Sequence, residues 1–430
     1  MISTRRGLLG ISPVIVFLLL YVVISVVQGD FYVMPFSVAL IIASAWAVII
    51  SKGTIPERLE IFSRAAGHSN IIYMIWIFIL AGAFASLAKE MGAVDATVDI
   101  TLRYLPASML VPGMFVAACF ISLAVGTSVG TVVALAPLSA EIASGAGVSG
   151  GFMIAVVLGG AFFGDNLSFI SDTTIAATRS QGCDMSDKFK ANIRIALPAA
   201  IATLAVYCLQ SMDVTPAAIH GDAPSAWLVL PYLVVIITAL CRMNVTIVLS
   251  LGILSAFLMG LSFGFKPLEM ASFMGKGIDG MGNLIVITLM SAGMLGLVKS
   301  CGGISWLLQT LTARIRGIRG AEACIAVLVG LVNMCTANNT VAIITVGSLS
   351  KEIASRFGIP PRKAASLLDT ASCIVQCLIP YGAQTLLATS LAGLSPAEPF
   401  PYLYYPWALA FCVAIAVIIP GNLLKKKAQP

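Results

Sequence analysis

Two acidic residues lie in an apolar part of the sequence, where they could bind an ion. Asp165 and Asp172 stand in Gly164–Thr178, directly after the apolar run Gly151–Phe163. An unpaired charge inside a lipid bilayer is expensive, so acids at such positions usually serve a function. A carboxylate removed from water also holds a proton more readily, which lets it exchange a proton for a cation. We therefore predict that Asp165 and Asp172 form a site for Na⁺ or a proton.

A structural role is the alternative for these acids. A carboxylate at the N-terminus of a half-helix caps the helix and interacts favourably with its dipole. Asp369, in Ser366–Ser372, is a third acid within an apolar segment, and the same alternative applies to it. We include Asp369 in the predicted site.

Neutral side chains that carry oxygen accompany the acids wherever the apolar segments are interrupted. Oxygen ligands without soft sulfur ligands suit a hard ion such as Na⁺. Besides the three aspartates, the predicted cation- and proton-binding residues are Asn166, Ser168, Ser171, Thr173, Thr127, Ser128, Asn338, Asn339, Thr340 and Gln376. With two histidines and no CxxC pair, no cofactor is expected beyond the transported Na⁺ and H⁺. No nucleophile–base pair is visible, so an enzyme is not expected.

The composition determines which elements must position these residues. The chain has 430 residues, 59% hydrophobic and 10% charged, and a mean hydropathy of +0.99. Apolar runs long enough to span a bilayer recur along it, which predicts an all-α polytopic membrane protein. The net charge of +6 lies in short loops between the runs, where it sets topology. Nucleic acid is therefore not an expected partner.

One fixed offset relates the two halves of the chain. Ala81–Gly82 matches Ala292–Gly293 and Thr178 matches Thr389, and the offset is the same in both cases (292 − 81 = 211; 389 − 178 = 211). We predict two repeats, residues 1–211 and 212–430. Each contains scaffold helices, a hairpin (around 107–143 and 321–354) and a broken helix (around 151–178 and 364–391).

Positive residues predict how the chain is oriented, because Lys and Arg favour cytoplasmic loops. The clusters assigned to the cytoplasm are Arg5 and Arg6; Lys188, Lys190 and Arg194; Arg314, Arg316 and Arg319; and Lys425–Lys427. The loop around Asp213, His220 and Asp222 lacks Lys and Arg and is assigned to the outside. Both termini are thus predicted to be cytoplasmic, with the repeats inverted relative to each other. Inverted repeats are typical of secondary transporters.

Interruptions in the apolar segments predict where the backbone breaks. We expect about ten spanning helices and two re-entrant hairpins that turn at Gly126–Thr131 and Thr336–Thr340. Two full spans would return the chain to the same side of the membrane as a re-entrant hairpin does, so this alternative stays open for each hairpin. Two further helices should break near their centres, at Gly164–Thr174 and at Gln376–Gln384, where Pro380 interrupts the helix. Irregular backbone at membrane depth is tolerated only inside protein or around a wet cavity.

At these breaks the sequence resembles the NhaC family of sodium/proton antiporters, within the ion-transporter superfamily. Gly164–Thr174 reads GDNLSFISDTT and resembles the family signature GDKxSPxSDTT. Gly126–Thr131 resembles its GTSWGT motif, and Leu368–Tyr381 resembles its ED…PLIPW segment. The resemblance covers most of the chain. It implies an elevator-like movement and exchange of Na⁺ for H⁺ across the bacterial cytoplasmic membrane.

The sequence departs from the family pattern at three positions. Asn166 stands where the family has Lys, Phe169 where it has Pro, and Tyr381 where it has Trp. The missing lysine removes a partner for an acid and leaves stoichiometry and electrogenicity open. Relatives include organic-acid and amino-acid exchangers, so the alternative is a Na⁺- or H⁺-coupled exchanger or symporter of such a substrate. The expected partners are therefore Na⁺, H⁺, the lipid bilayer, a small organic substrate in the alternative, and a second copy in a homodimer.

Overall fold

The computed structural model describes residues 4–24, 34–93, 96–97, 106–168, 171–212, 225–241, 243–312 and 315–418, which form helices and turns without a strand. This confirms the predicted all-α class. The predictions that concern Phe169, Arg314, the 213–222 loop and Lys425–Lys427 lie outside these residues.

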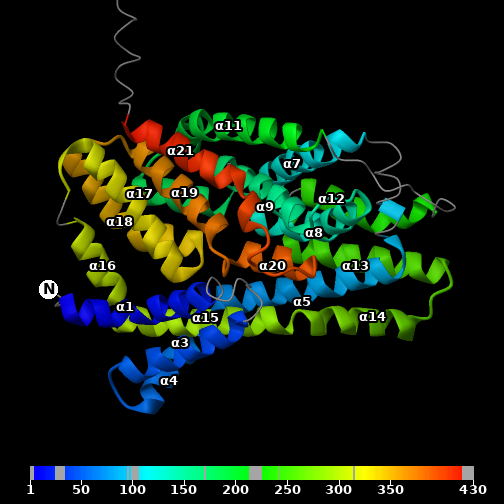
Figure 1. The fold of residues 1–430 in the computed structure, drawn as a ribbon, viewed down its shortest axis with the longest axis horizontal. Coiled ribbons are helices and arrows are strands. Elements are labelled where there is room, and N and C mark those ends of the chain that lie inside the picture. The colour runs from blue at the N-terminus through cyan, green and yellow to red at the C-terminus, as the bar shows by residue number, and fades with distance from the viewer. Residues whose placement is uncertain are drawn as a thin grey trace, which may run out of the picture.

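Figure 1 shows how the helices are arranged. The first part of the chain forms α1 (Thr4–Leu18), η1 (Leu19–Val23), α3 (Phe36–Ile50), α4 (Ile55–Ala66), α5 (Ser69–Glu90), α7 (Ala107–Val125), α8 (Ser128–Gly145), α9 (Gly150–Leu167), α10 (Asp172–Gln181) and α11 (Met185–Gln210). The second part forms η2 (Ala226–Val229), α12 (Leu230–Leu240), α13 (Val245–Ser262), α14 (Pro267–Gly280), α15 (Gly282–Ser300), α16 (Gly303–Thr312), α17 (Gly317–Thr336), α18 (Asn339–Phe357), α19 (Pro361–Leu378), α20 (Ala383–Leu391), η3 (Phe400–Tyr402) and α21 (Tyr404–Ile418).

The helices have the length and apolar surface of a multi-pass membrane protein. Within the described residues, eight helical stretches are long and apolar enough to cross a membrane, and shorter apolar helices accompany them. Large apolar side chains such as Phe120 (66% exposed) and Phe411 (68% exposed) point outward. Apolar side chains are stable on an outer surface when lipid covers it.

Two of the long stretches are broken where the sequence predicts it. α9 ends at Leu167, and α10 begins at Asp172. α19 ends at Leu378 and α20 begins at Ala383, because Pro380 cannot continue the helical hydrogen bonds. In Figure 1, α9, α19 and α20 occupy the middle of the molecule, between α11 and α21 on one side and α1 and α15 on the other.

The two predicted hairpins are α7–α8 and α17–α18, each closed by a left-handed residue. Gly126 (φ 74°) ends α7, and Ala337 (φ 49°) ends α17. Ala337 is the one residue other than glycine with a positive φ in the described part of the chain. Such strained positions gather at functional sites. The structure thus confirms the turns, while re-entry into a membrane stays a prediction.

Helix bounds recur at the offset found in the sequence. α9 spans 150–167 and α19 spans 361–378 (361 − 150 = 211; 378 − 167 = 211). Packing follows the same scheme, since α8 packs against α20 and α18 packs against α10. The assignment of two inverted domains with a boundary at 211–212 stays a prediction.

Small residues bring α9 close to α7. Gly160 and Gly164 form a GxxxG pair, and an added Cβ at Gly164 would overlap the side chain of Ser122 on α7. Ser122 Oγ donates to the carbonyl of Ala161 at 2.5 Å. Small residues at such spacing let helix backbones approach closely in membranes. This contact determines where the next residue, Asp165, is held.

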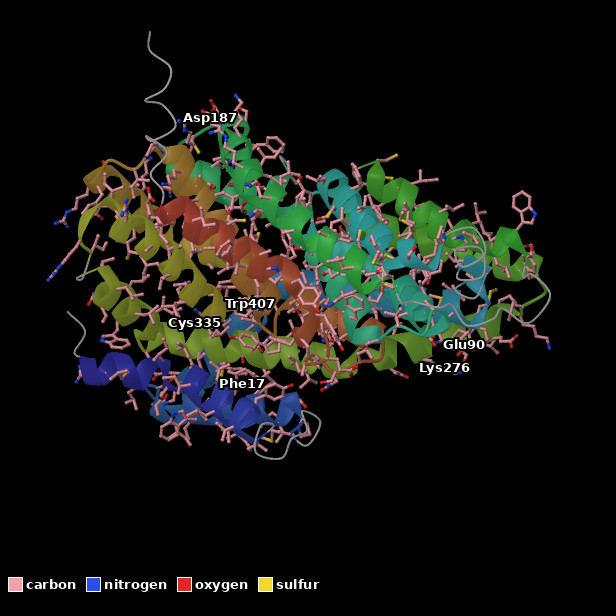
Figure 2. All side chains as sticks on the ribbon, turned by 45° about the horizontal axis from the view of Figure 1, so that its top comes forward. Phe17, Glu90, Asp187, Lys276, Cys335 and Trp407 are labelled. Carbon is pink, nitrogen blue, oxygen red and sulfur yellow. The ribbon has the colours of Figure 1, made fainter. Side chains whose placement is uncertain are left out.

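Outside the broken helices, α5 and α14 pack side by side. Their ends carry Glu90 and Lys276, which lie 4.0 Å apart and are close together in Figure 2. Both side chains are largely exposed, so this ion pair contributes little to stability.

Candidate functional site

A cavity of about 360 Å³ lies where the two hairpin turns and the two helix breaks meet. The predicted site residues that line it are Asp165, Asp172, Thr173, Thr127, Ser128, Asn338, Asn339, Thr340 and Gln376. Tyr73, Asn244 and Gln384 also line it. None of the described lining residues is basic. The described part of the cavity wall therefore carries two acidic side chains and no basic one, which favours a positively charged ligand.

Asp165 is the buried acid of this cavity. It lies in the last turn of α9 and is 5% exposed. Its Oδ2 accepts hydrogen bonds from Ser128 Oγ at 2.9 Å and from Asn339 Nδ2 at 3.4 Å. Ser128 and Asn339 begin α8 and α18 and are related by the offset (339 − 128 = 211). The carboxylate is thus held by one neutral donor from each hairpin.

Glutamine side chains extend this neutral network between the two hairpins. Gln384 Nε2 donates to Ser128 Oγ at 3.0 Å, and Gln376 Nε2 donates to Gln384 Oε1 at 2.9 Å. Gln376 Nε2 also lies 3.0 Å from the carbonyl of Ala337, the strained turn residue. These bonds connect the break in α19–α20 to both hairpin turns, so this part of the cavity wall is one hydrogen-bonded unit.

Asp172 differs from Asp165 in its surroundings. It is the first residue of α10 and is exposed, although it lines the cavity. The N-cap of α10 is the preceding Ser171, whose Oγ accepts from Thr174 N at 3.2 Å. The negative charge of Asp172 in the first turn interacts favourably with the helix dipole and so stabilises α10. The two acids that the sequence treats alike therefore have different environments.

Asp369 lies behind the cavity and is paired with a lysine. Its side chain is fully buried, and its Oδ2 lies 2.6 Å from Lys188 Nζ on α11. Lys188 is also fully buried. Asn192, one turn further along α11, donates to the same Oδ2 at 2.9 Å. Asp369 is therefore neutralised inside the protein and does not line the cavity.

The remaining predicted residues support the break in α9–α10 from behind. Ser171 Oγ donates to the carbonyl of Asp165 at 2.8 Å, and Ser168 Oγ donates to the carbonyl of Leu123 at 3.3 Å. Asn166 accepts from Asn192 Nδ2 at its side-chain oxygen, at 2.9 Å. These three residues satisfy backbone and side-chain groups that the break would otherwise leave buried without partners.

The structure corrects the assignment of Lys188 to a cytoplasmic loop. α11 begins at Met185, so Lys188 stands in its first turns, and it points inward. Lys188 and Asn192 are four residues apart and share one helix face, which was the available signal. Asn166 departs from the family's lysine, yet Lys188 Nζ lies 2.6 Å from the Asn166 carbonyl. A cation is therefore present near this position from another helix.

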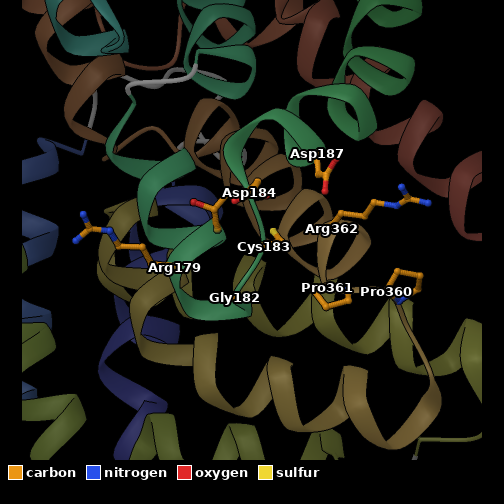
Figure 3. A pocket seen from close by; sticks show the side chains of 9 residues that line it. Arg179, Gly182, Cys183, Asp184, Asp187, Pro360, Pro361 and Arg362 are labelled. Atoms are coloured by element: carbon orange, nitrogen blue, oxygen red, sulfur yellow. The ribbon is translucent and has the colours of Figure 1, made fainter.

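A second cavity, of about 520 Å³, lies at the opposite end of α10. It is lined by Thr178, Arg179, Gly182, Cys183, Asp184, Asp187 and Pro360–Arg362. Figure 3 shows Asp187 and Arg362 on one side of it and Arg179 on the other. Two arginines and two aspartates balance in charge, so this cavity does not select an ion of either sign.

The broken helices, the buried acid and the polar cavity define a class of protein: a multi-pass membrane transporter of the secondary type. The sequence profile of the Na⁺/H⁺ antiporter family matches residues 6–212 and again residues 209–420. The chain belongs to the Na⁺/H⁺ antiporter family, which confirms the resemblance noted from its motifs.

Several characterised relatives are similar over most of their length. The Na⁺/H⁺ antiporter NhaC of Bacillus subtilis is 23% identical, over 79% of this chain and 81% of its own. The malate-2H⁺/Na⁺-lactate antiporter of the same organism is 20% identical, over 82% and 81%. The arginine/ornithine antiporter ArcD of Halobacterium salinarum is 21% identical, over 83% and 80%. The YdaH transporter structure from Alcanivorax borkumensis aligns over 97% of this chain and 99% of its own at 14% identity, with a TM-score of 0.41, a likeness that does not determine topology.

Proposed function

We propose that this protein exchanges Na⁺ for H⁺ by alternating access, with Asp165 as the group that both ions occupy in turn. The observation that carries the proposal is the pairing of Asp165: a buried carboxylate on a cavity, with two neutral partners. A carboxylate without a permanent counter-ion needs a proton or a cation when it is out of water.

Competition for one carboxylate accounts for coupling. When Asp165 is protonated it cannot offer its charge to Na⁺, and when Na⁺ is bound the proton must leave. The hydroxyl oxygen of Ser128 stands beside it as a further oxygen ligand. Asn339 and Gln384 turn their amide nitrogens toward Asp165 and Ser128, so each amide must rotate to offer its oxygen to the ion. The apparent affinity for Na⁺ should therefore fall as the pH falls.

The proposed setting is the bacterial cytoplasmic membrane, with both termini in the cytoplasm. Arg5 and Arg6 at one end and Lys425–Lys427 at the other support this orientation by the positive-inside rule. A membrane-impermeant thiol reagent applied from outside should fail to label cysteines introduced at either end. Labelling of a cysteine at one end would show that this terminus lies outside the cell, contrary to the proposal.

A small organic substrate is the second candidate, and the size of the cavity favours it. At about 360 Å³ the cavity is much larger than one water molecule, which takes about 30 Å³ of liquid. The names of two relatives, a malate–lactate antiporter and an arginine/ornithine antiporter, support the same idea. With two acids and no base among the described lining residues, the ammonium group of an amino acid suits the cavity better than a lone organic anion.

The test is the dissipation of a pH gradient by the purified protein in liposomes. Na⁺, Li⁺ and K⁺ are added in turn, followed by lactate, malate, arginine and ornithine, each with and without Na⁺. Na⁺-driven proton flux that is absent in Asp165→Asn supports the first candidate. Proton flux that appears only with an organic substrate supports the second candidate instead. Flux in Asp165→Asn equal to that of the wild type contradicts the role of Asp165 in binding Na⁺ and H⁺.

A further inference from the structure

The ammonium group of Lys188 sits in a shell of oxygen atoms. Its Nζ lies 2.6 Å from Asp369 Oδ2, 2.6 Å from the carbonyl of Asn166 and 2.6 Å from Thr174 Oγ1. These oxygens come from three different helices, α19, α9 and α10. A carboxylate, a backbone carbonyl at a helix break and a hydroxyl are the ligand types that hard cations take in proteins.

The residues of the shell and its neighbour Asn192 carry further buried oxygen atoms that the ammonium group does not use. Lys188 has three N–H donors, and the three oxygens above match them. Asp369, and Asn192 that contacts it, each carry one further buried oxygen, Oδ1, that has no hydrogen-bond partner. A metal cation typically takes about six oxygen ligands, so these unpartnered atoms suit an ion better than a lysine.

Asn166 connects this shell to the cavity site. The preceding residue, Asp165, points its carboxylate at the cavity, whereas the carbonyl of Asn166 points at Lys188. Asn192 Nδ2 bridges the two buried groups, since it donates to Asn166 Oδ1 at 2.9 Å and to Asp369 Oδ2 at 2.9 Å. Asn166 and Asn192 thus connect the two acids, with Asp165 on the cavity side and Asp369 on the Lys188 side.

We infer that Lys188 is a tethered cation that occupies a second Na⁺-type site built from Asp369, Asn166 and Thr174. By filling this site, its ammonium group keeps free ions out, so that only Asp165 exchanges ions. Removing the ammonium group opens the second site to Na⁺. The inference rests on the proposed function only for the choice of Na⁺ as the ion at Asp165.

The experiment measures Na⁺ bound per chain and Na⁺-dependent thermal stability of the full-length protein in detergent. Lys188→Met removes the charge and keeps most of the side-chain length. We expect ²²Na⁺ binding to rise from one ion per chain in the wild type to two in Lys188→Met. The melting temperature of Lys188→Met should be low in choline chloride and rise with added NaCl, because a ligand that binds only the folded state stabilises it.

The matched control is Lys188→Met with Asp369→Asn, which lacks both charges. It should bind one ion and show no more Na⁺-dependent stabilisation than the wild type. Equal Na⁺ responses in Lys188→Met and in this control would overturn the inference. If Lys188→Met does not fold, Lys188→Gln keeps a donor to Asp369, and the same comparison with Lys188→Gln/Asp369→Asn decides the matter.

The design also separates this inference from the proposed function. Lys188→Met combined with Asp165→Asn should bind one ion, held at Asp369. If the wild type binds no Na⁺ but Lys188→Met binds one, the Asp369 site stands and Na⁺ is not the ion at Asp165. If the wild type binds one and Lys188→Met also binds one, Asp165 keeps its role and the second site is rejected.

Discussion

Asp165 and Asp369 are both buried acids near the break of α9, but their partners differ. Asp165 faces a cavity and accepts from a serine and an asparagine, both neutral. Asp369 faces the interior and contacts the charged ammonium of Lys188. A buried carboxylate with a permanent counter-ion needs nothing from solvent. The difference teaches that burial of an acid does not by itself mark an ion site; the absence of a fixed positive partner does.

The largest effect is expected for Asp165→Asn. The amide has the size of the carboxylate but no charge for Na⁺ and H⁺ to compete for, so exchange should fall below detection. Glu60→Gln, an exposed acid on α4, is the control and should exchange normally. The measurement is Na⁺-driven proton flux in liposomes at equal protein content. Substantial flux in Asp165→Asn would show that Asp165 is not the exchanging group and would contradict the distinction between Asp165 and Asp369.

Asp369→Asn should instead act on stability. It leaves the buried Lys188 without a counter-charge, and breaking a buried ion pair costs about 3–5 kcal/mol. Asp165→Asn removes no fixed ion pair and should cost less. Thermal unfolding in detergent compares the two, with Lys188→Met/Asp369→Asn expected to recover part of the loss. Equal melting temperatures of Asp369→Asn and Asp165→Asn would show that the Asp369–Lys188 ion pair does not distinguish the two acids energetically.

Removing one neutral donor from Asp165 should weaken binding without abolishing it. Ser128→Ala and Asn339→Ala each delete a hydrogen bond to the carboxylate, worth about 1.5 kcal/mol or more, which is roughly tenfold in Na⁺ affinity. Ser139→Ala is a matched control on the same helix as Ser128, because Ser139 is buried and bonds only its own helix backbone at Ala136. The half-saturating Na⁺ concentration is measured for all three. A shift in Ser139→Ala of the same size would indicate a general packing effect.

The smallest effect is expected for Asp172→Asn. Asp172 is exposed at the cavity, so its charge attracts cations without holding one in place. We expect the half-saturating Na⁺ concentration to rise by about threefold at low ionic strength and less at high ionic strength. The series is run with added choline chloride. A loss as complete as that of Asp165→Asn would place Asp172 in the ion site itself.

Local patterns in the sequence predicted most of the framework. The apolar runs predicted membrane helices, Pro380 predicted the break in α19–α20, and Gly126 predicted a turn. These features depend on a few neighbouring residues, because backbone conformation and helix continuity are largely local. The offset of 211 could also be found from the sequence, because it compares residue types and not positions in space.

The division of roles between the acids was decided by tertiary contacts. Asp165 is joined to Asn339 across 174 residues, and Asp369 to Asn192 across 177. Lys188 has the sequence context of a basic loop, and only the packing of α11 against α19 buries it beside Asp369. The sequence alone determined that Asp165 and Asp172 lie at a break between apolar helices and that Asp369 lies within an apolar segment. Which acid faces a cavity and which faces a lysine depends on how distant helices pack, and residue spacing carries no information about that.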